Sequence, residues 1–326
     1  MTSPLSSPGS WPASELFDEL PDLPYPGGGQ TIERFRRLWA TAERSPSLGR
    51  LLEAHHDAKA ILAEAGVAVP DAWRFGVWAA GGPKPLVLEQ ECGRWRLHGE
   101  KAWCTGASLV SHALVSAGDG DSSTLVLVDM SAAGIELLPS SWMSPAFADI
   151  DTRTVAFDIT LGKQDVIGAE GWYLHRPGFW HGAVGVAACW AGCASGLVQR
   201  VVDQWRDDPH ALAHLGAIDA DIWTMRAVLA RAAAEIDADP FDSDPFDSDN
   251  GFQRALRVRH IVDTAVADIT TRLTRAIGPG PLAHQPELHT VLSEVDLYRR
   301  QCHAERDLQQ LGTLRRDSRS TGNTYV

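Results

Sequence analysis

Apolar residues near the start of the chain and in its second half recur at steps of three and four, which is typical of helices buried on one face. This spacing predicts helices over residues 31–42 and 47–64, the first capped by Thr31. The preceding stretch, 1–29, is rich in Pro, Ser and Gly and is expected to be a flexible arm, because it can bury little surface. Residues 30–66 therefore form an N-terminal helical region.

Between residues 67 and 171 the pattern changes to short apolar runs separated by Gly, Pro and Asp, which predicts β-strands. Residues 85–105 predict two strands that turn at 91–93, and the runs 124–130 and 152–159 predict two more. We expect this region to be a central β-domain, like a barrel or a sandwich.

Residues 172–326 are helical again. Small residues recur at steps of three and four along 179–205, so neighbouring helices are expected to approach this helix closely. Amphipathic patterns over 217–237, 253–277 and 286–311 predict three more helices, and together the four form a bundle. The expected fold is a mainly helical α+β multidomain protein with short N-terminal helices, a central β-domain and a C-terminal four-helix bundle.

Composition narrows the class of protein. The chain has 326 residues, and its 29 Lys and Arg against 42 Asp and Glu give a net charge of −13, which argues against nucleic-acid binding. There is no polybasic patch and no uninterrupted apolar run of about 20 residues, so we expect no membrane contact. Five cysteines without a CxxC pair favour neither disulfides nor a zinc site. The first residues have neither the basic start nor the apolar run of a secretion signal, so the expected location is cytoplasmic.

Motifs for several common chemistries are missing from the sequence. It contains no phosphate loop, no GxGxxG after a strand, no HExxH and no GxSxG. The repeated stretch PFDSDPFDSD, residues 240–249, offers Asp carboxylates for calcium but lacks the Gly and Glu positions of an EF-hand loop. We interpret it as a solvated loop between helices and expect no metal site.

One stretch carries a family signature. Residues 95–108, WRLHGEKAWCTGAS, resemble the β-domain of the acyl-CoA dehydrogenases, in which a strand end of the pattern Gly-x-Lys-x-aromatic-x-Thr/Ser meets a flavin. The matching positions are Gly99, Lys101, Trp103 and Thr105. The resemblance implies that Trp103 covers the flavin ring and that Thr105 lies beside the nitrogen that gains electron density on reduction.

The order of the elements extends the resemblance over residues 47–312 and implies FAD as the cofactor, with FMN as the alternative. Residues 275–288 resemble a helix end and Gly-rich turn of that family, which implies that Gly278 and Gly280 let the backbone approach the phosphates. A plain helix C-cap at Gly278 explains the same residues. The arginine of the family's phosphate-binding Arg-x-x-Phe-Gly stretch is replaced here by Leu212.

The catalytic carboxylate of the family is missing. Acyl-CoA dehydrogenases remove the α-proton of a thioester with a base, yet this chain has no Asp or Glu between 179 and 199 and no Glu after Arg306. The candidate replacements are His181, His303 and Glu305, because each lies near a position where the family places its base.

Three functions stay open at this point. The resemblance implies an FAD-dependent oxidoreductase that acts on the CH–CH group of an acyl thioester or a similar apolar substrate. A flavin-dependent monooxygenase of the same fold is the first alternative, because it needs no base for an α-proton. The second is a non-catalytic subunit that pairs with an active homologue or presents a binding surface. The expected assembly is a homodimer or homotetramer.

Overall fold

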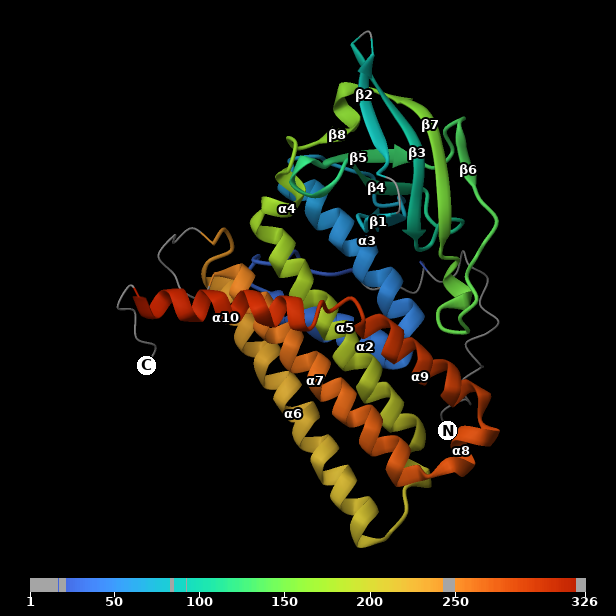
Figure 1. Ribbon diagram of the computed structural model, residues 1–326, viewed down its shortest axis with the longest axis vertical. Coiled ribbons are helices and arrows are strands. Elements are labelled where there is room, and N and C mark those ends of the chain that lie inside the picture. Colours follow the sequence, from blue (N-terminus) through green and yellow to red (C-terminus); the bar gives the residue numbers. More distant parts are fainter. Residues whose placement is uncertain (1–16, 18–21, 83–84, 92, 243–249, 321–326) are drawn as a thin grey trace. The chain divides into compact units, whose positions relative to one another are not determined.

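The structure is a computed structural model, and it describes residues 17, 22–82, 85–91, 93–242 and 250–320. Most of the predicted arm and of the repeated stretch at 240–249 lies outside the described residues. The chain forms two compact units (Figure 1). The β unit comprises Met1–Leu23 and Ser47–Phe179, and the helical unit comprises Pro24–Pro46 and Trp180–Val326. The two predicted N-terminal helices are therefore divided between the units.

The β unit contains two four-stranded sheets, as expected for the central β-domain. One sheet has the order β1-β4-β5-β8, in which only β1 and β4 are parallel, and the other has the antiparallel order β2-β3-β7-β6. The strands are β1 (Phe75–Trp78), β2 (Val87–Glu91), β3 (Arg94–Cys104), β4 (His112–Ala117), β5 (Thr124–Asp129), β6 (Ile135–Leu137), β7 (Arg153–Leu161) and β8 (Val166–Ile167). Strands β2 and β3 pair on either side of the predicted turn at 91–93, of which residue 92 lies outside the described residues, and the runs at 124–130 and 152–159 are β5 and β7.

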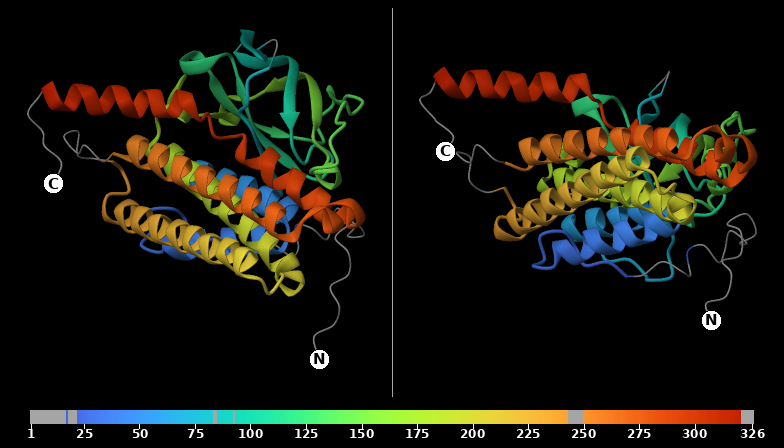
Figure 2. Two further views of the ribbon diagram at one scale, coloured as in Figure 1. Left: turned by 60° about the horizontal axis from the view of Figure 1, so that its bottom comes forward. Right: turned by 90° about the horizontal axis from the view of Figure 1, so that it is seen from below.

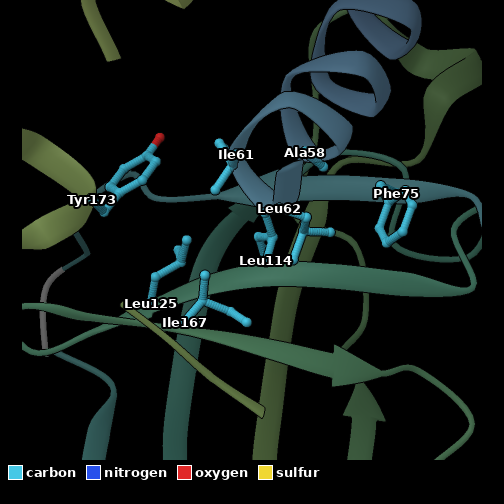
Figure 3. Close-up of a cluster of buried hydrophobic side chains, with 8 residues drawn as sticks. All are labelled: Ala58, Ile61, Leu62, Phe75, Leu114, Leu125, Ile167 and Tyr173. Carbon is cyan, nitrogen blue, oxygen red and sulfur yellow. The ribbon is translucent and has the colours of Figure 1, made fainter. Parts of the chain in front are cut away.

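Helix α3 (Pro46–Glu64) packs on the first of these sheets. Its residues Ala58, Ile61 and Leu62 meet strand residues such as Phe75 and Leu114 in one buried cluster (Figure 3). The short helix α4 (Trp172–His175) adds a tyrosine to the same cluster. Because α3 is held along its second half, its first turn has a fixed place in the β unit.

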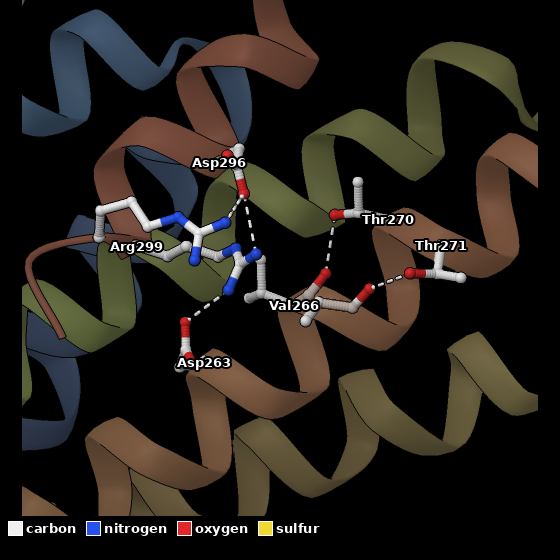
Figure 4. Close-up of polar contacts among 8 residues, drawn as sticks. Asp263, Val266, Thr270, Thr271, Asp296 and Arg299 are labelled. Carbon is white, nitrogen blue, oxygen red and sulfur yellow. Dashed lines mark hydrogen bonds and ion pairs between the residues drawn. The ribbon is translucent and has the colours of Figure 1, made fainter. Parts of the chain in front are cut away.

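The helical unit is built from long helices that lie side by side, and Figures 1 and 2 show α6 alongside α7. Its helices are α2 (Thr31–Arg44), α5 (Pro177–Val201, from residue 180 on), α6 (Pro209–Ala238), α7 (Gly251–Ile277), α8 (Pro279–His284), α9 (Pro286–Arg299) and α10 (Glu305–Ser320). Arg299 ties α9 to α7 by donating to Asp263 at 2.9 Å, and it also meets Asp296 at 2.8 Å (Figure 4).

Close approach to α5 is confirmed, and the partner is the N-terminal helix α2. A Cβ atom on Gly192 would overlap the backbone of Trp39, and one on Gly196 would overlap the backbone of Glu43. Arg200 then donates to the carbonyl oxygens of Glu43 and Arg44, at 3.2 and 2.8 Å, where α2 ends. Cations are favourable at this end of a helix, so the same contact also stabilises the α2 terminus.

Two details of the predicted helices are wrong. The single helix expected over 286–311 is broken between α9 and α10, where Ala304 has a φ of 44°. Buried Arg259 donates to the carbonyl oxygen of Gln301 and so satisfies a backbone group freed by the break. Thr31 is not the N-cap of α2, since Gln30 holds that position. The Thr31 hydroxyl instead donates to Asp237 of α6 at 2.6 Å.

Among the described residues, one helical stretch, Pro177–Gln204, is long and apolar enough to span a membrane by length and composition alone. Most of its apolar window is buried inside the protein, which is the pattern of a core helix. Its burial agrees with the close packing of α2 against Gly192.

Candidate functional site

Strand β3 ends in a bulge at the signature residues. Lys101 pairs with Val155 of β7 and Cys104 pairs with Arg153, so two residues of β3 face one residue of β7. Trp103 lies in this bulge with a φ of 63°, in the left-handed region that bulky residues rarely adopt. The bulge turns the Trp103 ring outward, and 55% of the residue is exposed.

Thr105, two residues further on, is held from several sides. Its backbone N–H donates to the carbonyl of Trp103 at 2.9 Å, and its own carbonyl accepts from the Trp78 indole at 3.0 Å. Its hydroxyl oxygen accepts from Arg50 Nη2 at 3.0 Å and from the Thr152 hydroxyl at 3.1 Å. Two accepted hydrogen bonds use both lone pairs of a hydroxyl, so the Thr105 O–H is left to act as a donor.

A second aromatic side chain stands beside Trp103. The Trp142 ring is perpendicular to it, with 6.0 Å between the ring centroids. Trp142 is itself fixed, because its indole N–H donates to the carbonyl of Ala146 at 2.8 Å. The strand end therefore presents a supported aromatic surface next to a hydroxyl donor.

The signature lysine points the opposite way and has a structural role. Lys101 is buried, and its Nζ donates to both the backbone oxygen and the hydroxyl of Ser116 on β4, each at 2.8 Å. Burial lowers the pKa of Lys101 to about 8 and raises the pKa of the neighbouring Cys104 thiol to about 12. A neutral thiol is a poor nucleophile, so Cys104 is a core residue and not a reactive one.

The structure places the three candidate bases in the helical unit. His181 is buried in α5, and its Nε2 lies 2.9 Å from the carbonyl oxygen of Pro240. Since a carbonyl only accepts, Nε2 carries the hydrogen of this hydrogen bond and does not act as an acceptor. Arg259 donates to the carbonyl oxygens of Ala183 and Gln301, so His181 and His303 lie near the same end of α7.

His303 and Glu305 lie close together at the start of α10. The His303 ring is 66% exposed, and its Nδ1 is 3.5 Å from the carboxylate of buried Asp307. Glu305 is exposed as the first residue of the helix. A negative charge is favourable at that position without any catalytic role.

Gly278 and Gly280 lie where α7 passes into α8. Gly278 has a φ of 73° and donates its N–H to the carbonyl of Thr274 at 3.2 Å, which is helix C-cap geometry. The space over both glycines is open, because a Cβ atom on either would meet nothing within 4 Å. Their predicted approach to a cofactor phosphate stays a prediction.

Sequence reasoning missed Arg50, Thr152 and Trp142. They lie 55, 47 and 37 positions away from Thr105, and no local motif links them to the strand end. Only the packing of α3 on its sheet and the pairing of β3 with β7 bring Arg50 and Thr152 to the Thr105 hydroxyl.

Helices followed by two sheets and a C-terminal helical region are the fold of the acyl-CoA dehydrogenases, so the expected fold class is confirmed. The sequence matches no family profile and no curated protein sequence. Solved structures with this fold include the dibenzothiophene monooxygenase TdsC from Paenibacillus sp. A11-2, in a complex with FMN and indole. Its TM-score is 0.75 at 17% identity, over 87% of this chain and 83% of that chain.

Two other structures are similar to the same degree. The methanesulfinate monooxygenase MsuC from Pseudomonas fluorescens has a TM-score of 0.75 at 17% identity, over 92% of this chain and 85% of that chain. KijD3, in a complex with FMN and a dTDP-linked amino keto sugar, has a TM-score of 0.74 at 17% identity. The match covers 90% of this chain and 80% of that chain. At this level of sequence identity, the structural similarity establishes the shared fold alone.

Proposed function

We propose that this chain is a flavin-dependent monooxygenase that uses FMN and acts on a small molecule. The observation that carries the proposal is the end of β3, where the exposed Trp103 ring adjoins a Thr105 hydroxyl with both lone pairs occupied. A flavin is a flat aromatic ring with an acceptor nitrogen at its edge, so it fits an aromatic surface beside a fixed donor.

Each residue would have a simple task. Thr105 would donate to the flavin edge, where electron density rises on reduction, and Trp103 would cover one part of the ring and exclude water. The redox and oxygen chemistry would come from the flavin. The protein would bind the flavin, orient it and tune its electronics.

The choice of monooxygenase over acyl-CoA dehydrogenase rests on the missing base. No carboxylate lies between residues 179 and 199, and the Nε2 of His181 is committed to the Pro240 carbonyl. The similar structures TdsC and MsuC are described as monooxygenases, and those of TdsC and KijD3 hold FMN. For this reason FMN takes the place of the FAD expected from the sequence, and monooxygenation takes the place of thioester oxidation. A cytoplasmic location and a homo-oligomer stay part of the proposal.

Replacing Thr105 with valine tests the site directly. Loss of one hydrogen bond of about 1.5 kcal/mol should weaken FMN binding about tenfold. Binding is measured by the quenching of FMN fluorescence on titration with the purified protein. Thr160→Val, at an exposed position of β7 in the same unit, is the control and should bind FMN like the wild type. If the wild type and both variants bind FMN with equal affinity, Thr105 does not contact the flavin.

Two further measurements separate the proposed function from its alternatives. Oxidised flavin on the protein should stay yellow when octanoyl-CoA is added without oxygen, whereas an acyl-CoA dehydrogenase would bleach it. Chemically reduced flavin on the protein should be reoxidised when air is admitted. A chain that takes up neither FMN nor FAD would instead support the non-catalytic subunit.

A further inference from the structure

Arg50 reaches the candidate site from a distant part of the sequence. It is the fifth residue of α3, and its guanidinium lies 4.9 Å from the centre of the buried Phe147 ring. From there its Nη2 donates to the Thr105 hydroxyl oxygen at 3.0 Å. A guanidinium has donors and no acceptor, so the Thr105 hydroxyl can only accept from it.

The direction of this hydrogen bond has a chemical consequence. With Arg50 and Thr152 both donating to it, the Thr105 oxygen has no lone pair left, and its hydrogen must point to an acceptor outside this group. We propose that Arg50 is a positioning residue for flavin reduction, which keeps the Thr105 hydroxyl a donor toward the flavin and adds positive charge behind it. This inference rests on the proposed function, because it assigns Arg50 a role toward the bound flavin.

A purely architectural role accounts less well for Arg50. The start of α3 is already joined to the segment before β7 by Ser47, whose hydroxyl donates to Asp149 at 2.7 Å. The second half of the helix is held by Ala58, Ile61 and Leu62. Arg50 is therefore not the contact that keeps α3 on the β unit, and its replacement should leave the fold in place.

The test is the reduction potential of FMN bound to the full-length protein, measured by equilibration with a reference dye. In Arg50→Met the preference for reduced over oxidised FMN should fall about tenfold, because a charge-assisted hydrogen bond is lost. For a two-electron couple this is a potential about 30 mV more negative. Arg50→Lys keeps the charge and a donor, so its potential should lie close to that of the wild type. Arg94→Met, at the exposed far end of β3, should leave the potential unchanged.

The double variant Arg50→Met/Thr105→Val shows whether Arg50 acts through Thr105. If it does, the shifts of the two single variants will not add. An unchanged potential in Arg50→Met, together with weaker FMN binding by Thr105→Val, would overturn the role of Arg50 and leave the proposed function standing. If neither Arg50→Met nor Arg50→Gln folds, as judged by circular dichroism, Arg50 is structural and the inference fails. A wild-type chain that takes up no flavin would overturn both.

Discussion

Replacing Gly192 with valine is expected to destabilise the protein by about 3 kcal/mol or more. Gly192 faces the backbone of Trp39, where α5 and α2 touch, and a Cβ atom there would overlap the Trp39 carbonyl oxygen. The obstacle is main chain and cannot rotate away, so the helices must separate and lose buried contacts along their length. Overpacking of a well-packed core costs 1–3 kcal/mol as a rule and more where nothing can yield.

Urea unfolding followed by circular dichroism would measure this loss. Gly216→Ala is the matched control, because Gly216 lies on the exposed face of α6 with nothing within 4 Å of an added Cβ. Alanine is the better helix former, so this variant should gain about 0.5–1 kcal/mol. A Gly192→Val protein as stable as the wild type would show that α2 and α5 do not meet at this glycine.

The second large effect is on the pH dependence of stability. Buried His55 in α3 accepts a hydrogen bond at Nδ1 from the backbone N–H of Phe75, at 3.1 Å, which requires a neutral Nδ1. Burial lowers the pKa of His55 from 6.5 to about 4, with the nearby charge of Lys59 acting in the same direction. Between these two pH values the unfolded chain binds a proton that the folded chain does not. Stability is therefore lost as the pH falls from about 6.5 to about 4, by about 3 kcal/mol from this residue.

Unfolding free energies measured between pH 7 and pH 4 for the wild type and for His55→Gln would isolate this contribution. The variant should lack the His55 part of the slope, since glutamine does not titrate and its oxygen still accepts from the Phe75 N–H. Thr160→Val, at an exposed position of β7 in the same unit, changes no titratable group and should keep the wild-type slope. Parallel profiles for wild type and His55→Gln would contradict the prediction.

Regular patterns made much of the fold predictable. The strand after residues 91–93 begins with alternating polar and apolar side chains, and the helices of the second half repeat apolar residues every three or four positions, so both could be placed. The strands β1 and β6 have only four and three residues, too few to show a period. The break between α9 and α10 contains neither Pro nor Gly, so no local signal marks it.

The candidate site was predictable only in part. Trp103 and Thr105 lie in one short stretch with a recognisable order, whereas the groups that set the direction of the Thr105 hydrogen bonds come from α3 and from the residue before β7. Such long-range contacts follow from tertiary packing and leave no spacing in the sequence. The conformation of Trp103 is a further example, because no residue preference predicts a tryptophan with a positive φ.

The positive φ of Trp103 makes the end of β3 locally less stable than a regular strand end. A left-handed backbone at a bulky residue costs about 1–3 kcal/mol, and an indole that stays more than half exposed recovers little of it by burial. Any molecule that covers the ring removes apolar surface from water, at about 25 cal/mol per Å², and so offsets this cost. Occupancy of the strand end should therefore be visible as a rise in the melting temperature of the chain, whatever chemistry the bound molecule goes on to perform.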